Sequence, residues 1–167
     1  GKAGIRPDID MGYRAAKAAS STPPEEGSVG VGTGCTVGKF CGMDYASDSG
    51  FGTYACRVGD IKVGAAVAVN EMYRNTGNTT LGIIITNAKF DKTSLTKIAG
   101  MAHNGYARAI RPVHTGADGD SIYAVSVGGI SADQDMVGTV AAEVMSRAIE
   151  TAVSDAESAF GHISASE

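Results

Sequence analysis

The chain contains no tryptophan, and aromatic residues make up only 6% of its 167 positions. With so few large rings, a hydrophobic core has to be filled mainly by small aliphatic side chains, in keeping with the overall hydrophobic content of 43%. The 23 glycines point the same way, because residues without a Cβ permit tight turns and close backbone approaches. The length fits one domain that can bury a substantial core.

Cysteine is also scarce, and its distribution argues against two kinds of structural site. Cys35, Cys41 and Cys56 are an odd number without a CxxC pair, so the sequence predicts neither a disulfide framework nor a zinc site. No apolar stretch is long enough to span a membrane, and no signal peptide opens the chain. The net charge of −4 and the pI near 5.3 argue against nucleic-acid or anionic-membrane partners. We therefore expect a cytoplasmic protein.

Hydrophobic periodicity predicts both helices and strands. The expected helices cover about 11–20, 91–110 and the segment from a Ser131/Gln134 capping box to Gly161, and the expected strands cover 28–37, 52–58, 61–69, 81–86 and 121–127. The run 81–86 is apolar without alternation, which predicts a strand buried on both faces. Central strands with helices at both ends of the sequence suggest an α/β (α+β) layered sandwich with the helices outside.

The most informative segment is Gly77-Asn78-Thr79-Thr80, directly before the apolar run that begins at Leu81. If the bond between Asn78 and Thr79 breaks, Thr79 gains a free amine beside its hydroxyl, so that one residue supplies both nucleophile and base. The ordinary alternative is a turn followed by a β-branched strand start. The segment alone does not decide between these interpretations.

Two other patterns favour structural explanations. The glycines around Lys39 lack the spacing of a nucleotide-binding loop, and Phe40 stands where such a loop has Ser or Thr. His103 and His114 have no second ligand at metal-binding spacing, so we expect them to be structural hydrogen-bonding residues.

Five separated blocks give the chain a recognisable order. They are VGTGCTVGK (31–39), VGAAVAVN (63–70), GNTTLGIIITNA (77–88), MAHNGYARAIRPVHT (101–115) and DGDS (118–121). The chain thereby resembles, from about Asp10 to Gly161, the family of L-aminopeptidase/D-esterases, β-peptidyl aminopeptidases and nylon-oligomer (6-aminohexanoate oligomer) hydrolases. The resemblance implies a four-layer αββα sandwich of the N-terminal-nucleophile-hydrolase type. It also implies a precursor that cuts itself before a Ser or Thr, and the Thr variant is most similar to the nylon-oligomer hydrolases.

The same resemblance implies site residues. Thr79 would be the nucleophile, Asn70 would place its side-chain amide near the oxyanion, and Tyr13 would be an active-site tyrosine. An amide N–H suits the oxyanion role because it donates without ionising. Asp118 and Asp120 would orient the nucleophile and handle protons. We expect these two carboxylates to point to opposite sides of the chain, one contacting Thr79 and the other supporting it from behind.

The sequence departs from the family pattern in three respects. Asp48 stands where the family usually has a lysine, for which Lys39 or Lys62 could substitute in space. The connection from Asn70 to Asn78 is shorter than in the family, through either an omitted loop or a natural deletion. The family's strand-rich N-terminal portion is also missing. We therefore expect residues 1–167 to form a single catalytic domain without that portion, in which 1–78 belongs to the larger fragment and 79–167 forms the smaller one after self-cleavage.

Three functions stay open at this stage. The first is an autoprocessed N-terminal-threonine amide hydrolase that acts on short peptides or linear amide oligomers through an acyl-enzyme, without metal or cofactor. The second is an N-acyltransferase of the ornithine-acetyltransferase type that uses the same threonine. The third, motivated by Asp48 and the short connection, is an uncleaved, inactive homologue that serves as a binding or structural subunit. The resemblance further implies a homo-oligomer of processed heterodimers.

Overall fold

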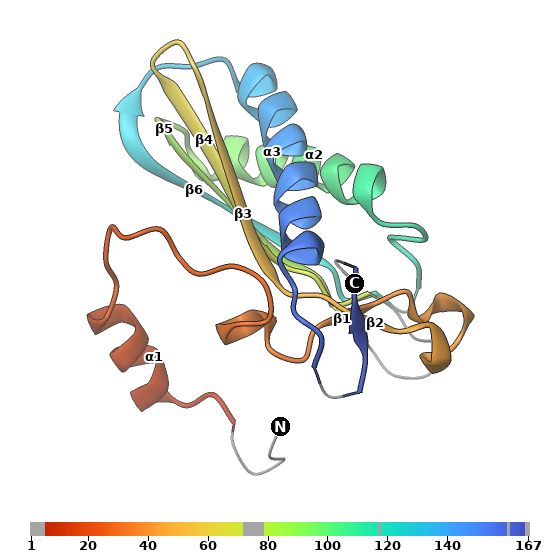
Figure 1. Cartoon of the computed structure of the whole chain (residues 1–167). Helices are drawn as coiled ribbons and strands as arrows, with labels where there is room; N and C mark the ends of the chain where they lie inside the picture. The colour runs from red at the N-terminus through yellow and green to blue at the C-terminus, as the bar shows by residue number, and fades with distance from the viewer. Residues whose placement is uncertain (1–5, 72–78, 117, 160, 166–167) are drawn as a thin grey trace.

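The computed structural model describes residues 6–71, 79–116, 118–159 and 161–165 (Figure 1). Its main feature is a four-stranded sheet in the order β3-β4-β5-β6. The strands are β3 (Phe51–Val58), β4 (Ile61–Ala68), β5 (Leu81–Ala88) and β6 (Ser121–Ile130). β3, β4 and β5 are antiparallel neighbours, whereas β5 and β6 run parallel. The parallel pair needs a crossover connection, and helix α2 provides it.

Two long helices cover one face of this sheet (Figure 1). α2 (Lys92–Ala109) begins after Asp91, whose carboxylate accepts a hydrogen bond from Ser94 N at 2.8 Å. α3 (Gln134–Ser154) begins after Asp133, which accepts from Met136 N at 2.8 Å. These are ordinary N-caps, in which a side-chain oxygen satisfies an unpaired amide of the first turn. The expected cap at Ser131 and the expected end at Gly161 are therefore wrong.

The core lies between the sheet and the two helices. It is built mainly from small aliphatic side chains, as the composition predicts, with Tyr106 as its largest fully buried member. Its members include Val63, Val67, Ile84, Ile98, Tyr106, Val137, Val144 and Met145. Alternate residues of β4 point into it, which is the period expected of a strand with one buried face.

The opposite face of the sheet carries exposed apolar side chains. Leu81 and Ile85 of β5 are 46% and 42% exposed, and Tyr123 and Val127 of β6 are both 67% exposed. The prediction of a strand buried on both faces is therefore wrong for β5, because helices cover only one face of the sheet within the described part of the chain. The described residues supply one sheet layer and one helix layer of the expected sandwich.

The N-terminal segment lies apart from the sheet (Figure 1). Its helix α1 (Ile9–Lys17) is capped by Asp8 and contains no buried residue. The expected strand over 28–37 is mostly wrong, since Gly30–Gly32 forms a 3-10 turn and only β1 (Thr36–Val37) is extended. β1 joins β2 (Ser47–Asp48) and β7 (Ile163–Ser164) in a small second sheet. Two further 3-10 turns, Lys39–Cys41 and Met43–Tyr45, connect β1 to β2.

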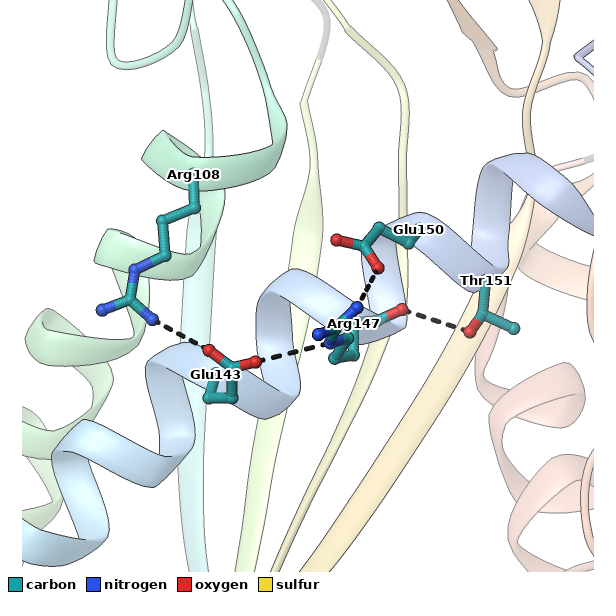
Figure 2. Close-up of polar contacts among 5 residues, drawn as sticks. All are labelled: Arg108, Glu143, Arg147, Glu150 and Thr151. Atoms are coloured by element: carbon teal, nitrogen blue, oxygen red, sulfur yellow. Dashed lines mark hydrogen bonds and ion pairs between the residues drawn. The ribbon is translucent and has the colours of Figure 1, made fainter.

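A chain of ion pairs links the exposed sides of α2 and α3 (Figure 2). Arg108 of α2 lies 3.3 Å from Glu143 of α3, and Arg147 bridges Glu143 at 3.4 Å and Glu150 at 3.0 Å. All four side chains are about half exposed, so solvent screens them and their contribution to stability is small. Neither these helices nor any other in the described ranges is long and apolar enough to cross a membrane.

Candidate active site

The register of the main sheet brings three distant segments together at one edge. β4 and β5 pair Ala68 with Leu81, and β5 and β6 pair Leu81 with Ser121. If these registers are continued two residues beyond the last paired residues, Thr79 falls opposite Asn70 on one side and Gly119 on the other. The contact with Gly119 is direct, because a Cβ built on that glycine would lie 2.6 Å from Thr79 Oγ1. The candidate nucleophile therefore rests against the backbone of the loop that leads into β6.

The two adjacent threonines have different surroundings. Thr80 is 1% exposed and points toward the helices, whereas Thr79 is partly exposed and shares the other face of the sheet with Leu81. The backbone of Thr80 is fixed on both sides, since its N–H donates to Asp120 Oδ1 at 2.9 Å and its carbonyl accepts from Ser121 N at 3.1 Å. Thr79 thus has the more accessible hydroxyl of the two, and its neighbour Thr80 is held firmly by hydrogen bonds.

The acidic pair contacts two different backbone groups. Asp120 holds Thr80 N–H, and Asp118 Oδ2 accepts from Thr115 N at 2.7 Å. Burial raises the pKa of Asp120, the hydrogen bond from Thr80 lowers it, and the nearby charge of Asp118 raises it further. Strand geometry gives no ground for expecting the two carboxylates to point to opposite sides, because residues two apart in an extended chain share a side. Asp120 is the one attached to the Thr79–Thr80 segment.

The side chain of Asn70 is oriented by two donors. Its Oδ1 accepts from Lys39 Nζ at 2.8 Å and from Thr36 N at 3.3 Å. These bonds identify the amide oxygen as the end that faces Lys39, so the NH₂ group is turned the other way. Lys39 is only 3% exposed; burial lowers its pKa, while Cys35 and Glu71 act in the opposite direction. An amide fixed in this way is suited to donate to a developing negative charge.

Lys39 places its amino group at the site, where Asp48 does not reach. The carboxylate of Asp48 is buried in the small sheet and accepts from Ala159 N at 2.5 Å. Lys62 is exposed at the far end of β4, where it lies opposite Arg57 in the register of β3 and β4. Of the two lysines considered as substitutes, Lys39 is therefore the one that reaches the expected site residues.

A group of ring side chains, of which Tyr106 is buried, His103 partly buried and His114 exposed, lies behind the Thr79–Thr80 segment. The Tyr106 hydroxyl of α2 lies 3.2 Å from Thr80 O and 3.3 Å from Ser121 O. The His103 ring packs edge-on against Tyr106 and His114, with centroids 5.2 and 5.1 Å apart. His114 Nε2 lies 3.3 Å from the backbone oxygen of His103, in keeping with the structural hydrogen-bonding role expected for His114. Sequence periodicity identified Tyr106 only as a core residue and gave no indication of these polar contacts.

His103 is the least satisfied member of this group. Its Nδ1 is buried and lacks a hydrogen-bond partner among the described residues. Burial lowers the pKa of His103, His114 lowers it further, and the Asp120 carboxylate raises it. Burial and Asp120 also raise the pKa of Tyr106, so its phenol stays protonated and can donate.

One expected site residue is not brought to this edge, and another falls outside the described part of the chain. Tyr13 lies on α1, 65% exposed and apart from the sheet, because none of the residues of α1 packs into the core. Asn78 lies outside the described residues. Within the described ranges, no group of three or more His, Cys, Asp or Glu side chains is arranged to hold a metal ion.

The fold is of the N-terminal-nucleophile-hydrolase type. The structure of an L-aminopeptidase/D-Ala-esterase/amidase from Ochrobactrum anthropi superimposes with a TM-score of 0.72 at 21% identity, over 91% of this chain and 50% of that chain. That protein is described as a new variant among the Ntn hydrolase fold. The fold class expected from the sequence is thereby confirmed.

The chain belongs to Peptidase family S58, whose sequence pattern matches residues 6–165. An uncharacterized aminopeptidase of Mycobacterium tuberculosis is 27% identical over 208 residues, which cover 93% of this chain and 60% of the relative. A 6-aminohexanoate-oligomer endohydrolase of Kocuria sp. is 24% identical over 193 residues, covering 84% of this chain and 54% of that protein. The expected membership of an enzyme family is confirmed, and the chain spans about 60% or less of the length of these two relatives.

Proposed function

We propose that this chain carries the catalytic threonine of an amide hydrolase that cuts itself between Asn78 and Thr79. The observation that carries the proposal is the position of Thr79. Its hydroxyl rests against Gly119 at the edge where Asn70 and Asp120 also lie, and the residue that follows it is held by hydrogen bonds. Membership of Peptidase family S58 supports a reaction at an amide bond.

The self-cleavage step follows from the chemistry of a threonine inside a chain. Thr79 Oγ attacks the carbonyl carbon of Asn78, the C–N bond to Thr79 breaks, and an ester replaces the amide. Water then hydrolyses this ester, so the Asn78 carboxylate leaves and Thr79 keeps a free amine beside its hydroxyl. That amine is the base that the mature enzyme needs.

The same groups serve turnover on substrate. Thr79 Oγ attacks the acyl carbon, the Thr79 amine takes the hydroxyl proton and passes it to the leaving amine, and water releases the acyl group. The Asn70 amide, oriented by Lys39, donates to the oxyanion. The negative charge of Asp120 favours the ammonium that forms at Thr79 during proton transfer.

The names of the relatives suggest the substrate class. Aminopeptidases release residues from peptide N-termini, and the 6-aminohexanoate-oligomer endohydrolases act on linear amide oligomers, so we propose short peptides or linear amide oligomers. The charge introduced by Asp48 had favoured an inactive homologue. Its burial in the small sheet, together with Lys39 at Asn70, speaks against that motive, whereas the other motive, the short connection from Asn70 to Asn78, lies largely outside the described residues.

Intact mass measurement of the purified full-length protein tests the cut directly. We expect two chains, the smaller of which begins at Thr79. Thr79→Ala should give one intact chain without amide hydrolysis, whereas Thr80→Ala should still cleave and hydrolyse, because only Thr79 acquires the free amine. A parent protein that stays intact after long incubation contradicts the proposal.

The assay also separates hydrolysis from acyl transfer. An aminoacyl p-nitroanilide and a 6-aminohexanoate oligomer are offered with and without ornithine as acceptor. We expect free acyl product in both conditions. Product formed only when ornithine is present, as acyl-ornithine, would identify the enzyme as a transferase.

A further inference from the structure

The hydroxyl of Tyr106 bridges the first residues of two neighbouring strands. It lies 3.2 Å from the carbonyl oxygen of Thr80, before β5, and 3.3 Å from that of Ser121, the first residue of β6. Tyr106 is fully buried, and its ring is fixed by core packing and by His103. A rigid donor at this point can hold the starts of β5 and β6 side by side.

Thr80 depends on such contacts, because the regular ladder of β5 begins only at Leu81. Three hydrogen bonds hold the Thr80 backbone: its N–H donates to Asp120, and its carbonyl accepts from Ser121 N and from Tyr106 OH. In an intact chain, Thr79 and Thr80 are tethered at both ends. After a cut before Thr79, they become a chain end, and chain ends fray unless something ties them down.

We propose that Tyr106 is a positioning residue that keeps the new N-terminus at Thr79 in register with Gly119 and Asn70. This inference rests on the proposed function. It predicts an asymmetry between the two reactions of the same threonine. Self-cleavage takes place while the Thr79–Thr80 segment is still tethered at both ends, so it depends only weakly on Tyr106. Turnover uses the free end, so it needs Tyr106 more.

The space around the Tyr106 hydroxyl is tightly filled. A Cβ built on Gly82, the second residue of β5, would lie 2.7 Å from Tyr106 OH and 2.7 Å from Met145 Cε. Any side chain at position 82 would therefore press on the hydroxyl and move it. Gly82→Ala thus disturbs the same contact from the opposite side while keeping the tyrosine.

The test compares processing with turnover in Tyr106→Phe, which keeps the ring and removes the hydroxyl. We expect self-cleavage within about threefold of the parent and kcat reduced about three- to tenfold at unchanged KM, the scale of one hydrogen bond. Hydrogen exchange should quicken at the amides of residues 80–84 in the processed protein, and not in an uncleaved Thr79→Ala background. Tyr54→Phe, the same change on β3, should match the parent.

Gly82→Ala and the double variant complete the experiment. Gly82→Ala should show the same split between processing and kcat, and the double variant should be no worse than the poorer single variant, because both changes break one contact. A parental kcat in Tyr106→Phe, or faster exchange spread evenly over the sheet, would overturn the positioning role while self-cleavage of the parent still stands. A parent that never cleaves would refute the proposed function and this inference with it.

Discussion

Gly119→Ala is the sharpest test of where the Thr79 hydroxyl lies. The added methyl would sit 2.6 Å from Thr79 Oγ1, whereas ordinary contacts begin near 3.4 Å, so the hydroxyl has to move by about 0.8 Å. A misplacement of about 1 Å can cost about 10²-fold in rate. We therefore expect self-cleavage and kcat to fall about 30- to 100-fold, with little change in the free energy of unfolding, because the Thr79 side chain can rotate away.

Single-turnover cleavage followed by intact mass, together with steady-state hydrolysis, measures both reactions. Gly116→Ala is the matched control, because it lies in the same loop and a Cβ there has nothing within 4 Å. We expect it to behave like the parent. If Gly119→Ala cleaves and hydrolyses at parental rates, Thr79 Oγ1 does not work from the position described here, and the assignment of the nucleophile fails.

Three further predictions concern the groups around Thr79. Asp120→Asn should lower turnover by about 10²–10⁴-fold and Asp118→Asn by less, because only Asp120 accepts a hydrogen bond from the Thr79–Thr80 segment. If both variants turn over substrate at the parental rate, the two carboxylates have no catalytic role and the segment is only a turn. Burial raises the pKa of Asp120 above its ordinary 3.8. Because the charged carboxylate is the active form, kcat/KM should rise with pH as Asp120 loses its proton, and Asp120→Asn should abolish this rise. Lys39→Met should lower kcat about 10- to 100-fold, because the Asn70 amide loses the donor that orients it. Lys62→Met should keep the parental kcat. Full activity of Lys39→Met would show that Lys39 has no role in turnover.

Local patterns in the sequence predicted the elements that depend on local rules. The strands around Gly59-Asp60, the apolar strand that begins at Leu81 and the helix capped by Asp91 all occur close to their expected positions. The start of α3 was misplaced because Ser131 and Asp133 are both good caps, and spacing alone does not choose between them. The face of β5 that helices leave exposed depends on tertiary packing, which a single strand's composition does not report.

The site was predictable only in part for a related reason. Thr79 and Asn70 stood out through the motifs that carry the family resemblance. Their alignment with Gly119 depends on strand register, and so could only be read from the sheet. Lys39 and Tyr106 act through single contacts made by side chains far away in sequence. A buried tyrosine on an apolar helix face looks the same in a sequence whether or not its hydroxyl has a partner.

The continuity of the sheet across position 79 has a thermodynamic consequence for a cut chain. β4 would then belong to one fragment and its neighbour β5 to the other, and α3 of the second fragment packs on β3 and β4 of the first. Unfolding of the intact chain is a one-molecule equilibrium, but the folded state of the cut chain is a complex of two molecules. Its denaturation midpoint should therefore rise with protein concentration. Self-cleavage would therefore make the folded state depend on protein concentration, because dilution favours separation of the two fragments.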